Sequence, residues 1–442
     1  MEKADSYQVR KLNPRKEYLI QVPGSKSITN RAFLLAALSG KKCVLSGVLF
    51  SDDTRGFLDC LIQLGFQVEV EKEKQRVTIQ GTGGRIPNPE ASINVRSAGT
   101  AARFLTVALA FVGGNYYLDA SEQMRKRPME PILKILEGLN VKFRYNNEIY
   151  HFPFELDYDV TQEENEMSEI TIDTNLSSQF ASALLMSACL LPKGLRIHLT
   201  GSRTAGSYIK MTLAMMKQFG IRVERTENDY VIAHQEGWGL TEYEVEPDVS
   251  AACYFYAMVP LLKTSVTVKG VQGESLQGDI QFLNVLEQMG CQKEVTSGGI
   301  KMTMKDPEMH GVDISMKDFS DQTMTLAAIA PFADSATRIH NIGHIRFQES
   351  DRIRAILTEL QRMGVCCEEV PEIDGVQIFP LEKGQEDQNV SIMIETYDDH
   401  RMAMAFTLPG LKTGNIVIKN PGCCRKTFEN YFSVIDSLYQ CH

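Results

Sequence analysis

The feature that most constrains the fold is a pattern that occurs five times: an amphipathic helix, a residue that ends it, and a short alternating strand. The residues that end the helices are Gly65, Asn140, Gly220, Gly290 and Gly364. Glycine and asparagine favour the left-handed conformation found at helix ends. The five positions lie 75, 80, 70 and 74 residues apart. This period exceeds the roughly 20–50 residues of solenoid and propeller repeats, so it predicts copies of a compact α/β unit.

At this spacing, a chain of 442 residues holds close to six copies. The sixth copy is expected to have its helix at residues 427–439, with the chain ending where the following strand would begin. Polar or proline-bearing segments at residues 21–24 and 243–248 separate the copies into two sets of three. The sequence therefore predicts an α/β protein of two similar domains. The alternative is a chance recurrence of a helix–glycine–strand junction that is common in α/β proteins.

Charge and hydropathy exclude several classes of partner. The formal net charge is −10, which argues against a protein that binds nucleic acid through a general positive field. The longest apolar stretches, residues 104–112 and 183–191, are far shorter than the ~20 residues that span a bilayer. Residues 1–15 lack the apolar core of a signal peptide, and the ten cysteines form no C-x-x-C pair. A reducing, cytoplasmic location is expected.

Despite the negative net charge, cations recur near the expected beginnings of helices. They are Lys26, Arg31, Arg103, Arg127, Arg352, Arg401 and Lys426. A cation at that end of a helix opposes the helix dipole unless an anion compensates it, and backbone N–H groups there also bind anions. Seven clustered cations would repel one another without such a ligand. The alternative for each is a solvated charge, but the set favours an enzyme that acts on small phosphorylated or carboxylated substrates.

Two carboxylates near these cations are candidates for proton transfer. Asp321 precedes an expected apolar helix at residues 324–330, and Glu349 lies three residues before Arg352. The alternatives are a carboxylate that stabilises a helix N-terminus and an ordinary ion pair on one helix face. His400 follows two aspartates, but no second histidine lies three or four residues further on. We therefore expect no metal site.

Eight segments, in this order, resemble the EPSP synthase (3-phosphoshikimate 1-carboxyvinyltransferase) family of enolpyruvyl transferases. They are P-G-S-K-S-I-T-N-R (23–31), A-G-T-A-A-R (98–103), R-K-R-P-M (125–129), S-S-Q-F (177–180), S-D-Q-T-M-T (320–325), E-S-D-R (349–352), D-D-H-R-M-A-M (398–404) and K-T-F (426–428). The resemblance implies an inside-out α/β barrel in each of two domains, built from three β-α-β-α-β-β copies around buried helices. It also implies that residues 1–22 and 246–442 form one domain and residues 23–245 the other, with the active site in the cleft between them.

The reaction implied by this resemblance joins phosphoenolpyruvate to the 5-hydroxyl of shikimate 3-phosphate and releases phosphate, in chorismate and aromatic amino-acid biosynthesis. It needs no metal or other cofactor. Asp321 would accept the proton of the attacking hydroxyl, and Glu349 would protonate the methylene carbon of phosphoenolpyruvate. Lys26 would lie between the two substrates. The family's usual state is a monomer. We therefore expect the two substrates to be the only partners, and we expect no binding to nucleic acid or to a membrane.

The resemblance also assigns binding residues. Shikimate 3-phosphate would be held by Lys26, Ser27, Arg31, Ser177, Ser178, Gln179, Asp321, His344 and Gln348. Phosphoenolpyruvate would be held by Lys26, Gly99, Arg127, Gln179, Arg352, Arg401 and Lys426.

Four positions depart from the family pattern. Ser97 and His344 stand where asparagine is common, Gln348 where lysine is common, and Ala205 where a phosphate-binding serine often lies. Ser202, Arg203 or Ser207 would be the substitutes for that serine. The changes at positions 348 and 205 predict weaker binding of shikimate 3-phosphate.

Two other functions remain open at this point. One is the sister enzyme, UDP-N-acetylglucosamine enolpyruvyl transferase, which shares the fold. That family normally carries a reactive cysteine in a mobile loop, whereas residues 113–131 contain no cysteine, and G-S-K-S stands at residues 24–27 in place of its G-K-N start. The other is a non-catalytic binding protein on the same scaffold, which the intact Asp321 and Glu349 disfavour.

Overall fold

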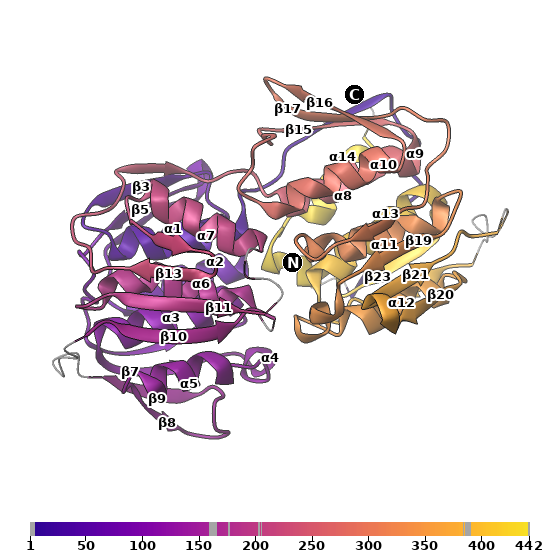
Figure 1. Ribbon diagram of the computed structural model, residues 1–442. Helices are drawn as coiled ribbons and strands as arrows, with labels where there is room; N and C mark the ends of the chain where they lie inside the picture. Colours follow the sequence, from indigo (N-terminus) through magenta and orange to yellow (C-terminus); the bar gives the residue numbers. More distant parts are fainter. Residues whose placement is uncertain are drawn as a thin grey trace. The chain divides into compact units, whose positions relative to one another are not determined.

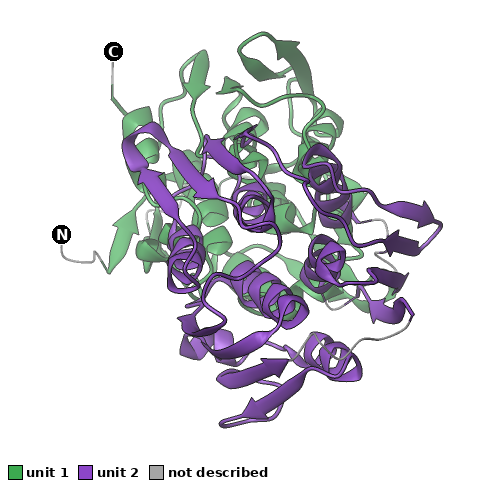
Figure 2. Cartoon of the chain, turned by 90° about the vertical axis from the view of Figure 1, so that its left-hand side faces the viewer, with its two compact units in different colours: residues 1–23, 247–442 green, residues 24–246 purple. Residues whose placement is uncertain are grey.

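The chain divides into two compact units, shown in green and purple in Figure 2. Unit 1 comprises Met1–Pro23 and Pro247–His442, and unit 2 comprises Gly24–Glu246. Each point at which the chain passes from one unit to the other lies one residue after the expected domain boundary. The structure is a computed structural model that describes residues 5–158, 166–175, 177–201, 204, 206–382, 384 and 390–440. Within these residues no helix is both long enough and apolar enough to cross a bilayer.

The described residues of unit 2 form three four-stranded sheets (Figure 1). The first has the order β14 (Glu242–Glu244), β3 (Lys42–Ser46), β5 (Arg76–Gln80), β4 (Val68–Glu71). The second has the order β6 (Glu90–Asn94), β7 (Gly114–Asp119), β9 (Phe154–Tyr158), β8 (Lys142–Tyr145). The third has the order β10 (Ser168–Asp173), β11 (Leu195–Thr200), β13 (Asp229–Ile232), β12 (Glu224–Thr226).

Unit 1 also contains three sheets among its described residues. The first has the order β2 (Glu17–Ile20), β15 (Ser265–Lys269), β17 (Gly299–Met304), β16 (Cys291–Thr296). The second has the order β18 (Asp313–Ser315), β19 (Thr337–His340), β21 (Gly375–Ile378), β20 (Cys367–Val370). The third has three strands, β22 (Ile392–Ile394), β23 (Ile416–Lys419) and β1 (Ser6–Gln8).

All six sheets follow one plan. The first two strands named in each order are parallel, and the third is antiparallel to the second. Parallel neighbours cannot be joined by a hairpin and need a crossover. A helix precedes the second strand in each copy: α1 (Lys26–Leu38), α3 (Gly99–Val112), α6 (Ser178–Ser187), α8 (Val249–Tyr256) with α9 (Met258–Leu262), α11 (Thr323–Ile329) and α13 (His400–Thr413). The predicted α/β class and the six copies are confirmed.

A second helix follows in each copy, and its end confirms the predicted helix stops. These helices are α2 (Asp52–Gln63), α5 (Glu130–Gly138), α7 (Ser207–Gln218), α10 (Phe282–Gln288), α12 (Arg352–Arg362) and α14 (Tyr431–Leu438). The five stop residues, from Gly65 to Gly364, have φ angles between 65° and 102°. The chain there adopts the left-handed conformation that the choice of glycine and asparagine indicated.

The sixth copy differs from the prediction in two ways. Its helix α14 begins at Tyr431 rather than at Thr427, because the chain first forms a 3₁₀ segment over Pro421–Lys426 and Thr427 then leaves the helical conformation with φ −139°. The third strand of its sheet, β1, comes from the other end of the sequence. Strand β1 pairs antiparallel with β23, with Tyr7 opposite Ile418.

The first helix of each copy forms the core. Almost every residue of α1, α3 and α6 is buried, and so is almost every residue of α11 and α13. In unit 2, α3 packs against α1 and α6, and in unit 1, α11 packs against α13. The N-terminal ends of α1, α3, α6 and α13, and the turn before α11, carry many of the site residues predicted from the sequence. Glu349 and Arg352 lie instead at the start of the second helix α12, and Lys426 precedes α14. One further segment, α4 (Glu122–Arg125), leads to Arg127.

Candidate functional site

Arg31 is a buried cation on helix α1 of unit 2. Its side chain is 1% exposed, and it donates from Nε to Thr212 Oγ1 at 2.8 Å and from Nη2 to Ser182 Oγ at 3.1 Å. Burial lowers the pKa of the guanidinium to about 10, so it stays charged at neutral pH. None of the ion pairs in the described part of the chain joins it to a carboxylate. A desolvated cation bound only by neutral oxygens suits an anionic ligand.

Lys26 begins the same helix and contacts a carboxylate that the sequence analysis did not identify. Its Nζ lies 3.3 Å from Asp53 Oδ2, and the two side chains are 15% and 4% exposed. Asp53 belongs to the first turn of α2, directly after the Ser51 cap. A carboxylate in the first turn of a helix is also explained by stabilisation of the helix N-terminus alone. Ser27, the next residue, places its backbone carbonyl 3.0 Å from Arg31 Nη1.

Gly99 begins α3 at a point where two guanidinium groups approach the backbone. A Cβ atom at this position would lie 2.7 Å from Arg127 Nη1 and 2.9 Å from Arg103 Nη1. Arg103 does not point to water. It is 2% exposed and donates to the carbonyls of Gly99 and Pro128, each at 3.2 Å. Arg103 therefore ties the start of α3 to the segment that carries Arg127.

Arg127 and Gln179 each have a buried polar atom that lacks a hydrogen-bond partner, Nε in Arg127 and Oε1 in Gln179. Buried polar atoms are rarely left unsatisfied in proteins. Gln179 lies in the first turn of α6, where Ser177 Oγ accepts from its backbone N at 3.2 Å and Ser178 is buried. This capping hydrogen bond explains the serine at position 177 without a ligand. The unsatisfied atoms of Arg127 and Gln179 leave one donor and one acceptor in unit 2 that a polar ligand could satisfy.

In unit 1, Arg352 lies at the centre of a group of carboxylates. It is 1% exposed and contacts Asp399 through Nε at 2.8 Å, Asp321 through Nη1 at 3.2 Å and Glu349 through Nη2 at 2.9 Å. Gln348 Oε1 also accepts from Nη1. Burial opposes the positive charge, but Asp399, Glu349 and Asp321 outweigh it and raise the pKa of Arg352. The pair of Glu349 and Arg352 is thus part of a buried network and not an ordinary surface pair.

Two further cations complete this network. Arg401 Nη2 lies 2.7 Å from Asp321 Oδ2, and Lys426 Nζ lies 3.4 Å from Glu349 Oε1. Asp321 therefore contacts two arginines, and Glu349 contacts one arginine and one lysine. The predicted unit 1 residues Asp321, Glu349, Arg352, Arg401 and Lys426, together with Asp399, form what we call the Arg352 cluster.

Asp399 was not among the predicted site residues. It is fully buried, accepts from Ser350 Oγ at 3.2 Å, and accepts from the backbone N of Arg401 at 2.9 Å. It thereby caps α13 and binds Arg352 at the same time. The sequence showed an aspartate at a helix start, but the bond to Arg352, 47 positions away, depends on the packing of both α12 and α13 against α11.

The four departures from the family pattern have different outcomes. His344 lies beside the Arg352 cluster, with Nε2 2.8 Å from Ser320 Oγ, and Gln348 is bound to Arg352 itself. Ser97 Oγ lies 2.8 Å from Ser121 Oγ. Ala205, with Ser202 and Arg203, lies outside the described residues. The weaker binding of shikimate 3-phosphate stays a prediction.

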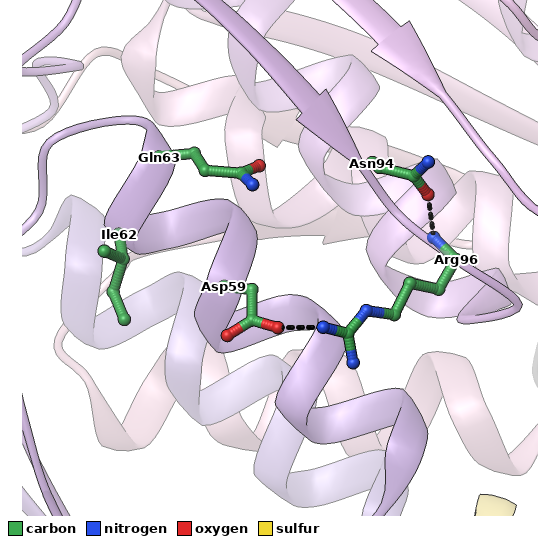
Figure 3. Close-up of a pocket in the computed structure, with 5 residues that line it drawn as sticks. All are labelled: Asp59, Ile62, Gln63, Asn94 and Arg96. Atoms are coloured by element: carbon green, nitrogen blue, oxygen red, sulfur yellow. Dashed lines mark hydrogen bonds and ion pairs between the residues drawn. The ribbon is translucent and has the colours of Figure 1, made fainter.

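A separate pocket of about 460 Å³ lies on unit 2 and is lined by Asp59, Ile62, Gln63, Asn94 and Arg96 (Figure 3). Arg96 forms an ion pair with Asp59, and its backbone N donates to Asn94 Oδ1 at 2.8 Å. None of the five residues is a predicted site residue. The two charges in its lining neutralise each other, so this pocket offers no net charge to an anionic ligand.

Comparisons with known proteins agree with the fold and with the order of the motifs. The sequence profile of the EPSP synthase (3-phosphoshikimate 1-carboxyvinyltransferase) family matches residues 15–435. A 3-phosphoshikimate 1-carboxyvinyltransferase of Nostoc punctiforme is 40% identical over 97% of this chain and 98% of the relative. The chloroplastic one of Arabidopsis thaliana is 36% identical over 95% and 82%.

A solved structure of EPSP synthase from Acinetobacter baumannii shares the fold, with a TM-score of 0.78, 21% identity and 98% coverage of both chains. These matches favour the EPSP synthase family over the related UDP-N-acetylglucosamine enolpyruvyl transferases. With a profile match over nearly its whole length and relatives at 36–40% identity, the chain belongs to the EPSP synthase (3-phosphoshikimate 1-carboxyvinyltransferase) family.

Proposed function

We propose that the protein transfers the enolpyruvyl group of phosphoenolpyruvate to the 5-hydroxyl of shikimate 3-phosphate and releases phosphate. The single observation that carries this proposal is the Arg352 cluster, in which both predicted proton-transfer residues contact cations that suit a substrate phosphate and carboxylate. Family membership supports the same reaction. The protein would act as a monomer in the cytoplasm.

In this proposal, residues of both units contact the substrates. Arg352, Arg401 and Lys426 of unit 1 bind the anionic groups of phosphoenolpyruvate, together with Arg127 beside Gly99. The remaining substrate is held in unit 2, where Arg31 lacks a carboxylate partner and the N-terminus of α6 can bind its phosphate. Fixing two anions in reactive geometry removes much of the entropic barrier to their reaction.

The chemistry requires opposite proton movements at the two carboxylates. Glu349 gives a proton to the methylene carbon of phosphoenolpyruvate, and the hydroxyl attacks the resulting cationic carbon while Asp321 takes the hydroxyl proton. The adduct then loses a methyl proton to the ionised Glu349, and phosphate leaves with the proton that Asp321 took up, which restores the double bond and both carboxyl groups. Contacts with Arg352 and Lys426 favour the ionised form of Glu349. Substrate anions that bind the same two cations would weaken those contacts and favour the protonated acid.

The test is phosphate release from phosphoenolpyruvate by the purified protein, with shikimate 3-phosphate or UDP-N-acetylglucosamine as the acceptor. We expect release only with shikimate 3-phosphate. Release only with the nucleotide sugar would assign the chain to the sister activity. A folded protein that releases phosphate with neither acceptor would support the non-catalytic alternative.

Replacing Gly99 with alanine is expected to raise the KM for phosphoenolpyruvate about tenfold. The new Cβ would lie 2.7 Å from Arg127 Nη1, so the guanidinium has to move away from its position and from the bound anion. A tenfold weaker binding corresponds to a loss of about 1.4 kcal/mol. Steady-state kinetics at saturating shikimate 3-phosphate measure the effect. Gly138→Ala is the matched control, because a Cβ at Gly138 in α5 meets no atom within 4 Å. An unchanged KM in Gly99→Ala would remove Arg127 from the binding of phosphoenolpyruvate.

A further inference from the structure

Asp279 is a buried carboxyl in unit 1 that the proposed reaction does not use. It lies in the 3₁₀ segment Gly278–Gln281 and is 6% exposed. Its Oδ2 accepts from Ser250 Oγ on α8 and from Gln322 Nε2 at 3.2 Å. In the part of the chain that the structure describes, no lysine or arginine forms an ion pair with it. Burying a carboxyl group without a cation is energetically costly, so a carboxyl group at position 279 needs a structural or functional reason.

Gln322 connects Asp279 to Asp321. It is the last residue of the 3₁₀ turn Ser320–Gln322, which carries Asp321, and it is fully buried. Its Nε2 donates to Asp279, while its Oε1 accepts from Thr325 Oγ1 at 2.9 Å. Both ends of the amide are therefore fixed. The turn that presents Asp321 to the two arginines is held on its inner side by a hydrogen bond to Asp279.

The charged groups around Asp279 come from several elements. Asp321 faces it from the neighbouring turn and Arg401 from α13. Cys253 on α8 also lies near it, and Cys253 Sγ donates to the Asp279 carbonyl at 3.6 Å. Asp248, which caps α8, lies near Cys253. Burial first, and then repulsion from Asp321, raise the pKa of Asp279 to about 7, although Arg401 opposes this. Asp279 thus changes charge near neutral pH.

We propose that Asp279 is a positioning residue for Asp321 in the reaction proposed above, on which this inference rests. Through Gln322 it fixes the turn that carries Asp321. When Asp279 is ionised, its negative charge disfavours a second negative charge nearby and so favours the uptake of a proton by Asp321. This is the step in which Asp321 accepts the proton of the substrate hydroxyl.

The sign of the pH dependence follows from this arrangement. Below about pH 7 the carboxyl of Asp279 is protonated and exerts no repulsion on Asp321. As the pH rises through this value, Asp279 becomes negative and Asp321 becomes a better proton acceptor. The turnover number of the wild-type protein is therefore expected to rise with pH across this range.

The first experiment measures kcat and KM of Asp279→Asn between about pH 5.5 and 9. We expect kcat at the alkaline end to fall about tenfold, both KM values to change less than about twofold, and the rise near neutral pH to disappear. Asp313→Asn, which changes an exposed aspartate at the start of β18, is the control and should match the wild type. A merely structural role would lower kcat by one factor at every pH, and that result would overturn the proposal.

Gln322→Met separates the two parts of the proposal, because it removes the amide but leaves Asp279. It is expected to lower kcat at all pH values while the rise near neutral pH remains. A second measurement uses carbon NMR of the wild-type protein to follow the titration of its aspartate carboxyls with pH. It needs no substrate and does not depend on whether an Asp279 variant folds. A buried carboxyl that titrates at about pH 7 and shifts in Gln322→Met supports the proposal. If no aspartate carboxyl titrates between about pH 6 and 8, the proposal is wrong, whether or not the protein has the proposed activity.

Discussion

Glu349→Gln is expected to bind both substrates and to turn them over about 10³-fold more slowly than the wild type. Glutamine keeps the size of the side chain and a carbonyl oxygen that can accept from Arg352 and Lys426, which lie 2.9 and 3.4 Å from the carboxylate. It cannot donate a proton to carbon, and removal of a positioned general acid costs about 10²–10⁴-fold in rate. Single-turnover phosphate release measures the chemical step, and calorimetric titration measures binding.

The matched control for this change is Glu369→Gln. Glu369 also pairs with an arginine, Arg346, but it is 44% exposed on β20. We expect wild-type turnover from it. A Glu349→Gln protein that turns over within a few-fold of wild type would exclude Glu349 as the acid.

Arg352→Met is expected to lower the free energy of unfolding by about 3–5 kcal/mol. The side chain is 1% exposed and contacts three carboxylates, those of Asp321, Glu349 and Asp399. Methionine fills much of the space but leaves these carboxylates with less positive charge in a buried environment, and removal of one partner from a buried ion network is costly to this extent. Urea unfolding followed by circular dichroism measures the loss.

Arg354→Met provides the comparison, since Arg354 is exposed on the same helix, two residues further on. We expect a change within about 0.5 kcal/mol. Equal losses for the two variants would mean that Arg352 does not hold the cluster together.

The features that could be predicted from the sequence were local ones. The end of a helix at Gly65 or Asn140 depends on the φ angle of one residue, and the choice of glycine or asparagine reveals that angle. The period between these ends then implied six copies, because each copy contains the same local pattern. Resemblance to a family placed the site residues, and the structure brings those of unit 1 into one cluster around Arg352.

The partners of the site residues could not be predicted, because they are set by packing between distant segments. Asp53 lies in the first turn of α2 and Asp399 caps α13, and either place explains an aspartate without any site. Only the packing of α1 with α2, and of α12 and α13 with α11, brings these carboxylates to Lys26 and Arg352. Arg103 is a further example: its place near a helix start suggested an anion site, but only the structure shows that Nη1 and Nη2 each donate to a backbone carbonyl of its own unit.

The interruption of unit 1 by unit 2 has a consequence for biosynthesis. Domains generally begin to fold from the N-terminus while the chain is still being made, at about 5–20 residues per second. Strands β1 and β2 emerge first, but β1 pairs with β23, and Tyr7 must wait for Ile418, 411 residues later. All three sheets of unit 2 can form during those tens of seconds. Throughout that interval the earliest strands stay without their neighbours, and such unpaired edges are the segments that chaperones protect from aggregation.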